Sequence, residues 1–281
     1  MERRRFGWTG VEVPVIGQGT WFIDEEDRST VIAALRRGLD LGMTHIDTAE
    51  LYGWGAAEEI VAEAIAGRRR DVFLVSKVVP DHASRRGTID ACEQSLRRLD
   101  TDWLDCYLLH WPGQYPLEST IDAFDQLKQD GKIRSWGVSN FDVADLEQAY
   151  GIAGAGAIAC NQVLYNLTER AIEYGVLPWC ETHDVAVVGY APFGHGEFPS
   201  PRTRGGRVLA EIATAHGATP RQVALRFLVR RPSLLTIPKT ANPDHAAENA
   251  AAGDLRLSNE ELARIDAAFS LGPLPSQLPT L

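Results

Sequence analysis

The sequence predicts a (β/α)8 TIM barrel over residues 1–281, in which a closed parallel sheet is surrounded by helices. Three observations lead to this fold class: apolar runs alternate with helical segments, eight such runs occur, and they are rich in Val, Ile and Leu. Strands of this composition are buried on both faces, as in a parallel sheet covered by helices. The alternative is an open doubly wound sheet. Barrels of this length fold as one unit, so we expect a single domain with its active site at the carboxyl ends of the strands.

Each strand is expected where an apolar run ends at a turn signal. The expected strands are residues 15–19, 44–48, 72–77, 104–110, 133–139, 157–162, 186–190 and 234–238. The segments with helical spacing are residues 29–41, 57–66, 88–99, 118–129, 144–150, 172–182, 208–230 and 243–252. Local signals mark some of the helix ends. Gly42 follows the first helix, and Ser258 with Glu261 forms a capping-box pattern before a last helix.

The charge balance restricts the partners of this chain. It carries 28 basic and 38 acidic residues, for a formal net charge of -10. Such a chain repels phosphate backbones and anionic lipid, so we expect no nucleic-acid or membrane partner. The short basic runs at Arg3–Arg5 and residues 68–70 are interpreted as solvated surface.

The compartment is inferred from apolar runs and from cysteine usage. No run approaches the roughly 20 apolar residues of a membrane span, and the first residues lack the apolar stretch of a signal peptide. Cys92, Cys106, Cys160 and Cys180 stand far apart with no CxxC pair, which argues against a zinc ribbon or a redox dithiol. We therefore expect a cytoplasmic protein with free, buried thiols.

Polar side chains occur at the carboxyl ends of seven predicted strands. They are Asp47, Lys77, His110, Ser139, Asn140, Gln162, Tyr190 and Lys239. For any one of them, the start of a polar loop is an equally good explanation. Together they include the titratable types that proton transfer requires, and in a barrel they would meet at one rim.

The chemistry of this rim follows from ordinary pKa values. Phenol and ammonium groups have pKa values of about 10 and 10.4, so Tyr52 is a weak acid unless a charge such as that of Lys77 stabilises its phenolate. Asp47 would keep a buried Lys77 charged. Tyr52 could then give a proton to a carbonyl oxygen, and His110 could hydrogen-bond to the same oxygen. No covalent nucleophile is needed.

Five ordered motifs carry a family resemblance. They are GMTHIDTAELYG, LVSKV, LLHWP, GKIRSWGVSNF and IPKT. With these motifs the chain resembles the aldo-keto reductase family over nearly its whole length, and as a short-loop, bacterial-type member it is similar to the reductases of methylglyoxal and other small aldehydes. The resemblance implies a metal-free, monomeric barrel that moves a hydride between a nicotinamide cofactor and a carbonyl compound. It places the catalytic roles on Asp47, Tyr52, Lys77 and His110, as argued above.

The cofactor assignment depends on the resemblance, because no GxGxxG turn follows the first predicted strand. The implied cofactor residues are Gly19, Thr20, Trp21, Asp47, Ser139, Asn140, Gln162, Tyr190, Ala191, Pro192, Phe193, Gly194, Pro238, Lys239, Thr240, His245, Glu248 and Asn249. In this pattern Lys239 and Thr240 meet the 2′-phosphate of NADPH. His245 stands where the family often has arginine, and histidine carries at most a partial charge, so use of NADH is possible as well. Ala191 replaces a common serine, which we interpret as neutral variation.

The substrate is expected to be a small carbonyl compound. The rim loops look short, and only about a dozen irregular residues follow the last helix, so the pocket should be open. The predicted substrate-contacting residues are Trp21, Tyr52, Trp54, His110 and Trp111, with Phe193 as a further wall. Small aldehydes, dicarbonyls and keto-sugars fit such a site better than a steroid does.

Two other functions remain open from the sequence. His45 and Asp47 point to the same side of a strand and, with His110, could belong to a metal-dependent barrel hydrolase. The same barrel could also be a non-catalytic, NADPH-binding regulatory subunit, like the potassium-channel β subunits of the family. The complete set of four catalytic positions favours an enzyme.

Overall fold

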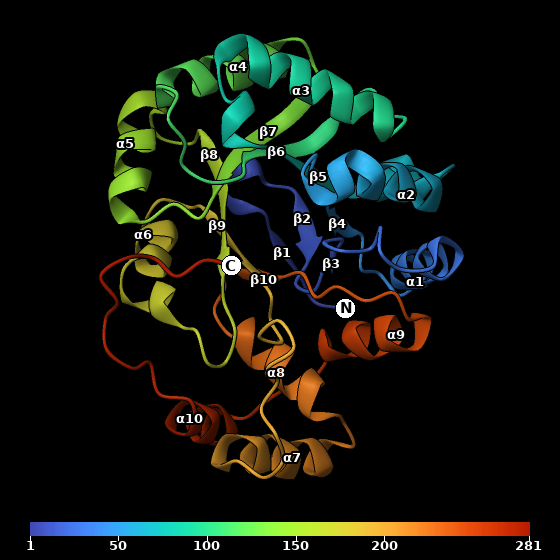
Figure 1. The fold of residues 1–281 in the computed structure, drawn as a ribbon. Helices are drawn as coiled ribbons and strands as arrows, with labels where there is room; N and C mark the ends of the chain where they lie inside the picture. The colour runs from blue at the N-terminus through green and yellow to red at the C-terminus, as the bar shows by residue number, and fades with distance from the viewer.

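The computed structural model describes all residues 1–281 and contains one eight-stranded parallel sheet (Figure 1). Its strands, in spatial order, are β3 (Gln18–Gly19), β4 (His45–Asp47), β5 (Phe73–Val78), β6 (Leu104–Leu109), β7 (Ile133–Ser139), β8 (Ile158–Leu164), β9 (Ala186–Tyr190) and β10 (Leu234–Thr236). Parallel bridges Ile16–Thr236 and Gly19–Lys239 join the first strand to the last. The amide of Gly17 donates to the carbonyl of Thr236 at 2.8 Å. The predicted closed barrel is confirmed, and each predicted strand is present.

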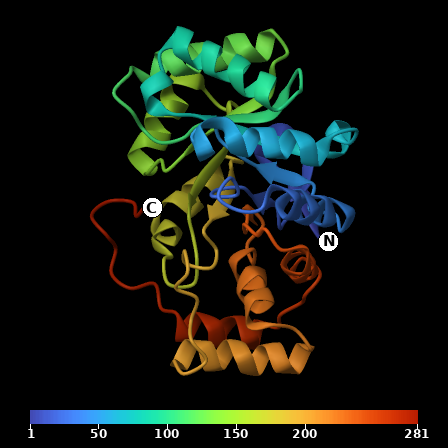
Figure 2. The same cartoon turned by 45° about the vertical axis from the view of Figure 1, so that its right-hand side comes forward.

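Helices surround the sheet on its outer side (Figures 1 and 2). They are α1 (Arg28–Asp40), α2 (Ala56–Ile65), α3 (Arg85–Arg98), α4 (Leu117–Gln129), α5 (Val143–Ala153), α6 (Val176–Thr182), α7 (Arg204–His216), α8 (Pro220–Leu228), α9 (Pro243–Ala252) and α10 (Asn259–Ala268). Short 3-10 helices are η1 (Gly7–Thr9), η2 (Tyr52–Gly55), η3 (Arg69–Asp71), η4 (Pro80–His82) and η5 (Ala171–Tyr174). Helices α7 and α10 pack on each other outside the main ring. The predicted capping box of Ser258 and Glu261 opens α10.

The single helix predicted over residues 208–230 is wrong, because the chain forms α7 and α8 there. Gly217 ends α7 in a left-handed conformation, with φ 60°. Thr219 then caps α8 through a capping box with Gln222, and Pro220 occupies the first helical turn. Proline at this position has no amide hydrogen to lose, so it starts a new helix more readily than it continues an old one.

The first residues form a hairpin that the sequence did not predict, β1 (Arg3–Arg5) paired with β2 (Glu12–Pro14). Phe6, between these strands, is fully buried and packs against Phe73 of the barrel interior. Arg4 donates to the carbonyl of Leu234 at 3.1 Å and pairs with Glu2 at 2.7 Å. The interpretation of this basic run as solvated surface is therefore wrong for Arg4.

The second basic run, residues 68–70, also has a structural role. Arg69 donates to the carboxylate of Asp105 at 2.9 Å and to the carbonyl of Trp103 at 2.7 Å. Its side chain is mostly buried between the end of η3 and β6. The solvated-surface interpretation is therefore wrong for Arg69, whereas Arg70 is exposed as expected.

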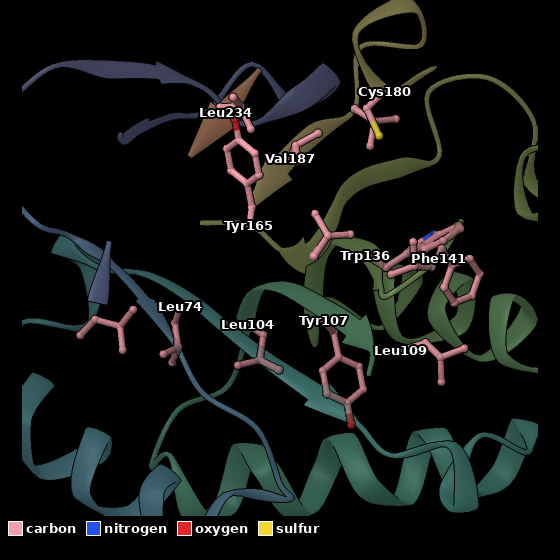
Figure 3. Close-up of a cluster of buried hydrophobic side chains, with 14 of the residues drawn as sticks. Leu74, Leu104, Tyr107, Leu109, Trp136, Phe141, Tyr165, Cys180, Val187 and Leu234 are labelled. Atoms are coloured by element: carbon pink, nitrogen blue, oxygen red, sulfur yellow. The ribbon is translucent and has the colours of Figure 1, made fainter. Parts of the chain in front are cut away.

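The core has two layers, one inside the barrel and one between the sheet and its helices. Val75, Cys106 and Val188 belong to the inner layer. Figure 3 shows part of the outer layer, where Tyr107 points from β6 toward the covering helices. All four cysteines are free and buried, as predicted. None of the helices has both the length and the apolar character needed to cross a membrane.

Candidate active site

A cavity of about 540 Å³ opens at the carboxyl ends of the barrel strands. Of the predicted site residues, those that line it are Gly19, Thr20, Trp21, Asp47, Tyr52, His110, Trp111, Ser139, Asn140, Gln162, Tyr190, Ala191, Pro192, Phe193 and Lys239. Those outside the lining are Trp54, Lys77, Gly194, Pro238, Thr240, His245, Glu248 and Asn249. The barrel therefore gathers residues from seven of its eight strand ends in the cavity lining, as expected for this fold.

Lys77 is fully buried beneath the cavity floor and has all three ammonium hydrogens engaged. It donates to the carboxylate of Asp47 at 2.6 Å, to the carbonyl of Thr48 at 2.9 Å and to the phenol oxygen of Tyr52 at 3.1 Å. The strand register brings the first pair together, because Asp47 of β4 lies opposite Val75 of β5, two residues before Lys77 on the same face. Burial lowers the pKa of Lys77, but Asp47 and Tyr52 outweigh it and hold that pKa above its ordinary value.

Asp47 also has both of its carboxylate oxygens engaged. One accepts from Lys77, and the other accepts from the side-chain amide of Gln162 at 2.7 Å. Gln162 lies on β8, on the far side of the barrel from β4. A buried carboxylate is tolerated only with such partners. The predicted pairing of Asp47 with Lys77 is thus present in the structure, and Gln162 completes it.

Tyr52 lies in a tight turn whose next two residues, Gly53 and Trp54, have φ values of 56° and 51°. Its ring lies against the Lys77 ammonium, with 4.8 Å between nitrogen and ring centroid. Burial raises the pKa of the phenol and outweighs the opposing effect of Lys77, so the net shift is upward. Lys77 does lower the pKa of the Tyr52 phenol, as expected, but burial raises that pKa by more. Tyr52 therefore carries its proton at neutral pH.

An ammonium group has no acceptor, so Lys77 can only donate to Tyr52. The hydrogen of the phenol is therefore directed elsewhere, and Tyr52 lines the cavity. A protonated donor thus faces the space where a substrate would lie.

His110 follows β6 and lies beside Tyr52, with 5.7 Å between the ring centroids. Burial, with a smaller effect from Lys77, lowers the pKa of His110 to about 2, so the imidazole is neutral. Its Nδ1 atom is buried and has no hydrogen-bond partner. We assign the single ring proton to Nε2, since this tautomer leaves no buried N–H unpaired. His110 is then a neutral hydrogen-bond donor at the cavity.

Hydrogen bonds also hold three further polar side chains of the cavity in place, those of Ser139, Asn140 and Tyr190. Ser139 donates to the carbonyl of Gln162 at 2.9 Å, and Asn140 donates to the carbonyl of His110 at 3.3 Å. The Asn140 amide oxygen accepts from the hydroxyl of Tyr190 at 3.0 Å. Asn140 has a left-handed backbone, with φ 59°, which aims its side chain at the cavity. Amide and hydroxyl groups of this kind suit a bound carboxamide.

The predicted phosphate end is only partly inside the cavity. Lys239 lines the cavity and forms an ion pair with Glu26 at 3.0 Å. His245 is exposed, at the start of α9. The carboxylate of Glu248 accepts from Thr219, which caps α8. Lys239 is therefore the one predicted phosphate ligand that already faces the site.

The cavity walls include residues that the sequence pattern missed. Trp21 stacks on Phe22 and on His195, with 4.4 and 5.3 Å between ring centroids. Leu281 also lines the cavity, and its amide donates to the hydroxyl of Tyr190 at 3.4 Å. The last residues are irregular, as predicted, and they return to the rim (Figure 1), where Leu281 forms part of the cavity wall. Trp54 is 83% exposed and does not form a wall.

The metal-hydrolase alternative loses its ligands in this arrangement. His45 is fully buried below the rim, with its ring edge-on to Phe6 and Phe73 at 5.8 and 5.5 Å. It does not join Asp47 and His110 at the cavity. No group of three or more His, Cys, Asp or Glu side chains is placed to hold a metal ion.

Comparison with known proteins gives consistent matches. The family described as "Aldo/keto reductase family" matches residues 15–269. Methylglyoxal reductase YeaE of Escherichia coli (strain K12) is 45% identical over 276 residues, 96% of each chain. Glyoxal reductase of Bacillus subtilis (strain 168) is 32% identical over 280 residues, 96% of this chain and 95% of its own. The crystal structure of an aldo/keto reductase from Klebsiella pneumoniae in complex with NADP and acetate superposes with a TM-score of 0.93, at 44% identity and 100% coverage of both chains.

Proposed function

This chain belongs to the aldo/keto reductase family, and from that premise we propose that it reduces small aldehydes and dicarbonyls of the methylglyoxal type with NADPH. The observation that carries the proposal is the engagement of all three Lys77 hydrogens, the last by the phenol oxygen of Tyr52. This arrangement keeps the phenol hydrogen free for an acceptor in the cavity. A carbonyl oxygen is such an acceptor.

The residues present fit the nicotinamide cofactor. Ser139, Asn140 and Gln162 offer hydroxyl and amide groups in the same cavity as Tyr52 and would hold the carboxamide, while the ring of Tyr190 would stack on the nicotinamide. Lys239 would pair with a phosphate. NADPH supplies the hydride that adds to the carbonyl carbon.

Side chains of the protein then protonate and orient the carbonyl oxygen of the substrate. As the carbonyl carbon gains the hydride, its oxygen gains negative charge and takes the proton of Tyr52. Lys77, 3.1 Å from the phenol oxygen, stabilises the phenolate that remains, and Asp47 holds Lys77 charged. His110, neutral and at the same wall, donates a hydrogen bond that orients the oxygen. Uptake of a proton from water restores Tyr52.

The size of the site supports a small substrate. Pockets of about 300–1,000 Å³ hold one drug-sized ligand, and the cavity of about 540 Å³ must hold the nicotinamide ring as well as the substrate. Trp21, Trp111 and Leu281 narrow the space that remains. Two- and three-carbon dicarbonyls fit this space better than polycyclic ketones.

The test is a panel assay that follows NADPH consumption with methylglyoxal, other small aldehydes, keto-sugars and a steroid ketone. We expect turnover of the small carbonyl compounds and a fall of about 10²- to 10⁴-fold in kcat for Tyr52→Phe, with unchanged NADP⁺ affinity. Turnover confined to the steroid would refute the proposed substrate class. Full activity of Tyr52→Phe would show that another group gives the proton.

A non-catalytic, NADPH-binding regulatory role is the second candidate. The hydrogen bonds of Lys77 to Asp47 and Tyr52, with His110 beside the Tyr52 ring, argue against it. Binding of NADPH without its oxidation by any aldehyde of the panel would support it.

We further propose that the chain acts as a cytoplasmic, single-domain monomer. Its four free, buried thiols are consistent with a reducing compartment. Light scattering of the purified protein tests the monomer, and a dimer mass would refute it.

A further inference from the structure

Lys239 carries the only permanent positive charge among the residues that line the cavity. It follows β10, and its side chain forms a 3.0 Å ion pair with Glu26, in the loop between β3 and α1. The pair therefore spans the two strands at which the barrel closes. When a phosphate enters this cavity, its main counter-charge, the ammonium of Lys239, is already paired with Glu26.

Glu26 belongs to the acidic run Asp24, Glu25, Glu26 and Asp27, but these residues differ in what they contact. Asp27 caps α1 by accepting from the amide of Thr30 at 2.8 Å. Asp24 packs against Gly53, the residue after Tyr52. Glu25 is exposed and forms no ion pair. Only Glu26 reaches a cation.

Barrel closure does not depend on this ion pair. The backbone of Gly19 donates to the carbonyl of Pro238 at 3.1 Å, and the bridge between Gly19 and Lys239 holds the same segments together. The side chains are 30% and 47% exposed, and partly exposed ion pairs contribute little to stability. A role in ligand binding explains the pair better than a role in folding.

We propose that Glu26 competes with the 2′-phosphate of NADPH for Lys239, and so lowers the affinity for NADPH more than the affinity for NADH. The inference rests on the proposed function, in which Lys239 meets this phosphate. NADH has a hydroxyl at the same position and does not displace the carboxylate. Glu26 thus reduces the preference of the protein for NADPH over NADH. The Glu26 carboxylate also forms its ion pair with Lys239 again when NADP⁺ leaves, which favours release of the oxidised cofactor.

The test measures binding of NADP⁺ and NAD⁺ by calorimetry to the wild-type chain and to Glu26→Gln. We expect Glu26→Gln to tighten NADP⁺ binding about two- to fivefold, the range that a partly exposed ion pair commands, with a smaller change for NAD⁺. Glu25→Gln is the matched control, since it makes the same change in net charge at an adjacent residue that has no partner. In the Lys239→Met background, Glu26→Gln should have no further effect on NADP⁺.

The other outcomes are distinct. An equal gain from Glu25→Gln would overturn the inference, because net charge alone would then account for it. Weaker NADP⁺ binding in Glu26→Gln would also overturn it, since the ion pair would then belong to the bound state. A wild-type chain that binds no NADP⁺ would instead contradict the proposed function.

Discussion

The ammonium of Lys77 lies 2.6 Å from the carboxylate of Asp47, and neither side chain has significant contact with solvent. Two opposite charges are thus removed from water inside the barrel rim. Such a pair is tolerated when further hydrogen bonds satisfy the remaining lone pairs and protons. Here Thr48, Tyr52 and Gln162 provide them. The site therefore depends on each member being present.

Asp47→Asn should lower the free energy of unfolding by about 3 kcal/mol, because Lys77 would remain buried without its counter-charge. Urea unfolding measures the loss. Glu63→Gln is the control, since Glu63 pairs with Arg28 at the same 2.6 Å distance but on the surface. Glu63→Gln should lower the free energy of unfolding by less than about 1 kcal/mol. Equal losses in the two variants would mean that burial adds nothing to the Asp47 pair.

The rate of carbonyl reduction should be independent of His110 ionisation between pH 4 and pH 8. The pKa of His110 is lowered to about 2, so the ring stays neutral throughout this range. At high pH the rate should fall only above pH 10, since the pKa of Tyr52 is raised from 10.0 and the phenol must hold its proton. A pH profile of kcat/KM checks both limits. An inflection near pH 6.5 that disappears in His110→Gln would contradict the neutral assignment.

Acid should weaken the fold through His45. This residue is fully buried, both ring nitrogens lack partners, and burial lowers its pKa from 6.5 to about 4. Below pH 6.5 the unfolded chain takes up a proton on His45, while the folded chain does not. The stability of the folded state with respect to this group is therefore fully present above pH 6.5, and it is lost as the pH falls toward 4. A shift of this size corresponds to about 3 kcal/mol.

Urea unfolding at pH 7 and pH 5 measures this effect. His45→Leu should remove most of the difference between the two pH values, while His245→Leu, at an exposed position, should leave it unchanged. An unchanged difference in His45→Leu would assign the acid sensitivity to other groups.

Glu50 should position Tyr52 relative to Lys77. Its buried carboxylate accepts from the amide of Val79 at 2.9 Å and contacts Nδ1 of His82 at 3.1 Å, which ties the Tyr52 turn to the end of β5. Glu50→Ala should lower kcat about tenfold through loss of alignment, with unchanged NADP⁺ affinity. Glu50→Gln keeps an acceptor for Val79 and should retain most of the activity. Comparable losses in both variants would indicate that the charge matters rather than the hydrogen bond.

The strands and the polar side chains at their carboxyl ends could be predicted from the sequence because each signal is local. An apolar run followed by Asp47, Lys77 or His110 marks both the strand and its polar carboxyl end. The helix break near Gly217 had local signals as well, but the apolar periodicity on either side obscured it.

Other features depend on contacts between distant segments and leave no local pattern. The Glu26–Lys239 pair joins residues 213 positions apart. The stacking of His195 on Trp21 and the return of Leu281 to the rim come from irregular segments, which have no periodicity. The sequence of an irregular segment therefore does not predict where in the fold its side chains lie.

Closure of the barrel between β3 and β10 also bears on how the chain folds. These strands lie near opposite ends of the sequence, so until β10 is synthesised β3 has a neighbour on one side only. Its free edge exposes unpaired amide and carbonyl groups, which can pair with another chain. Newly made protein should therefore be most prone to aggregation just before its last strand docks, and a truncation that removes β10 would make that vulnerable intermediate permanent.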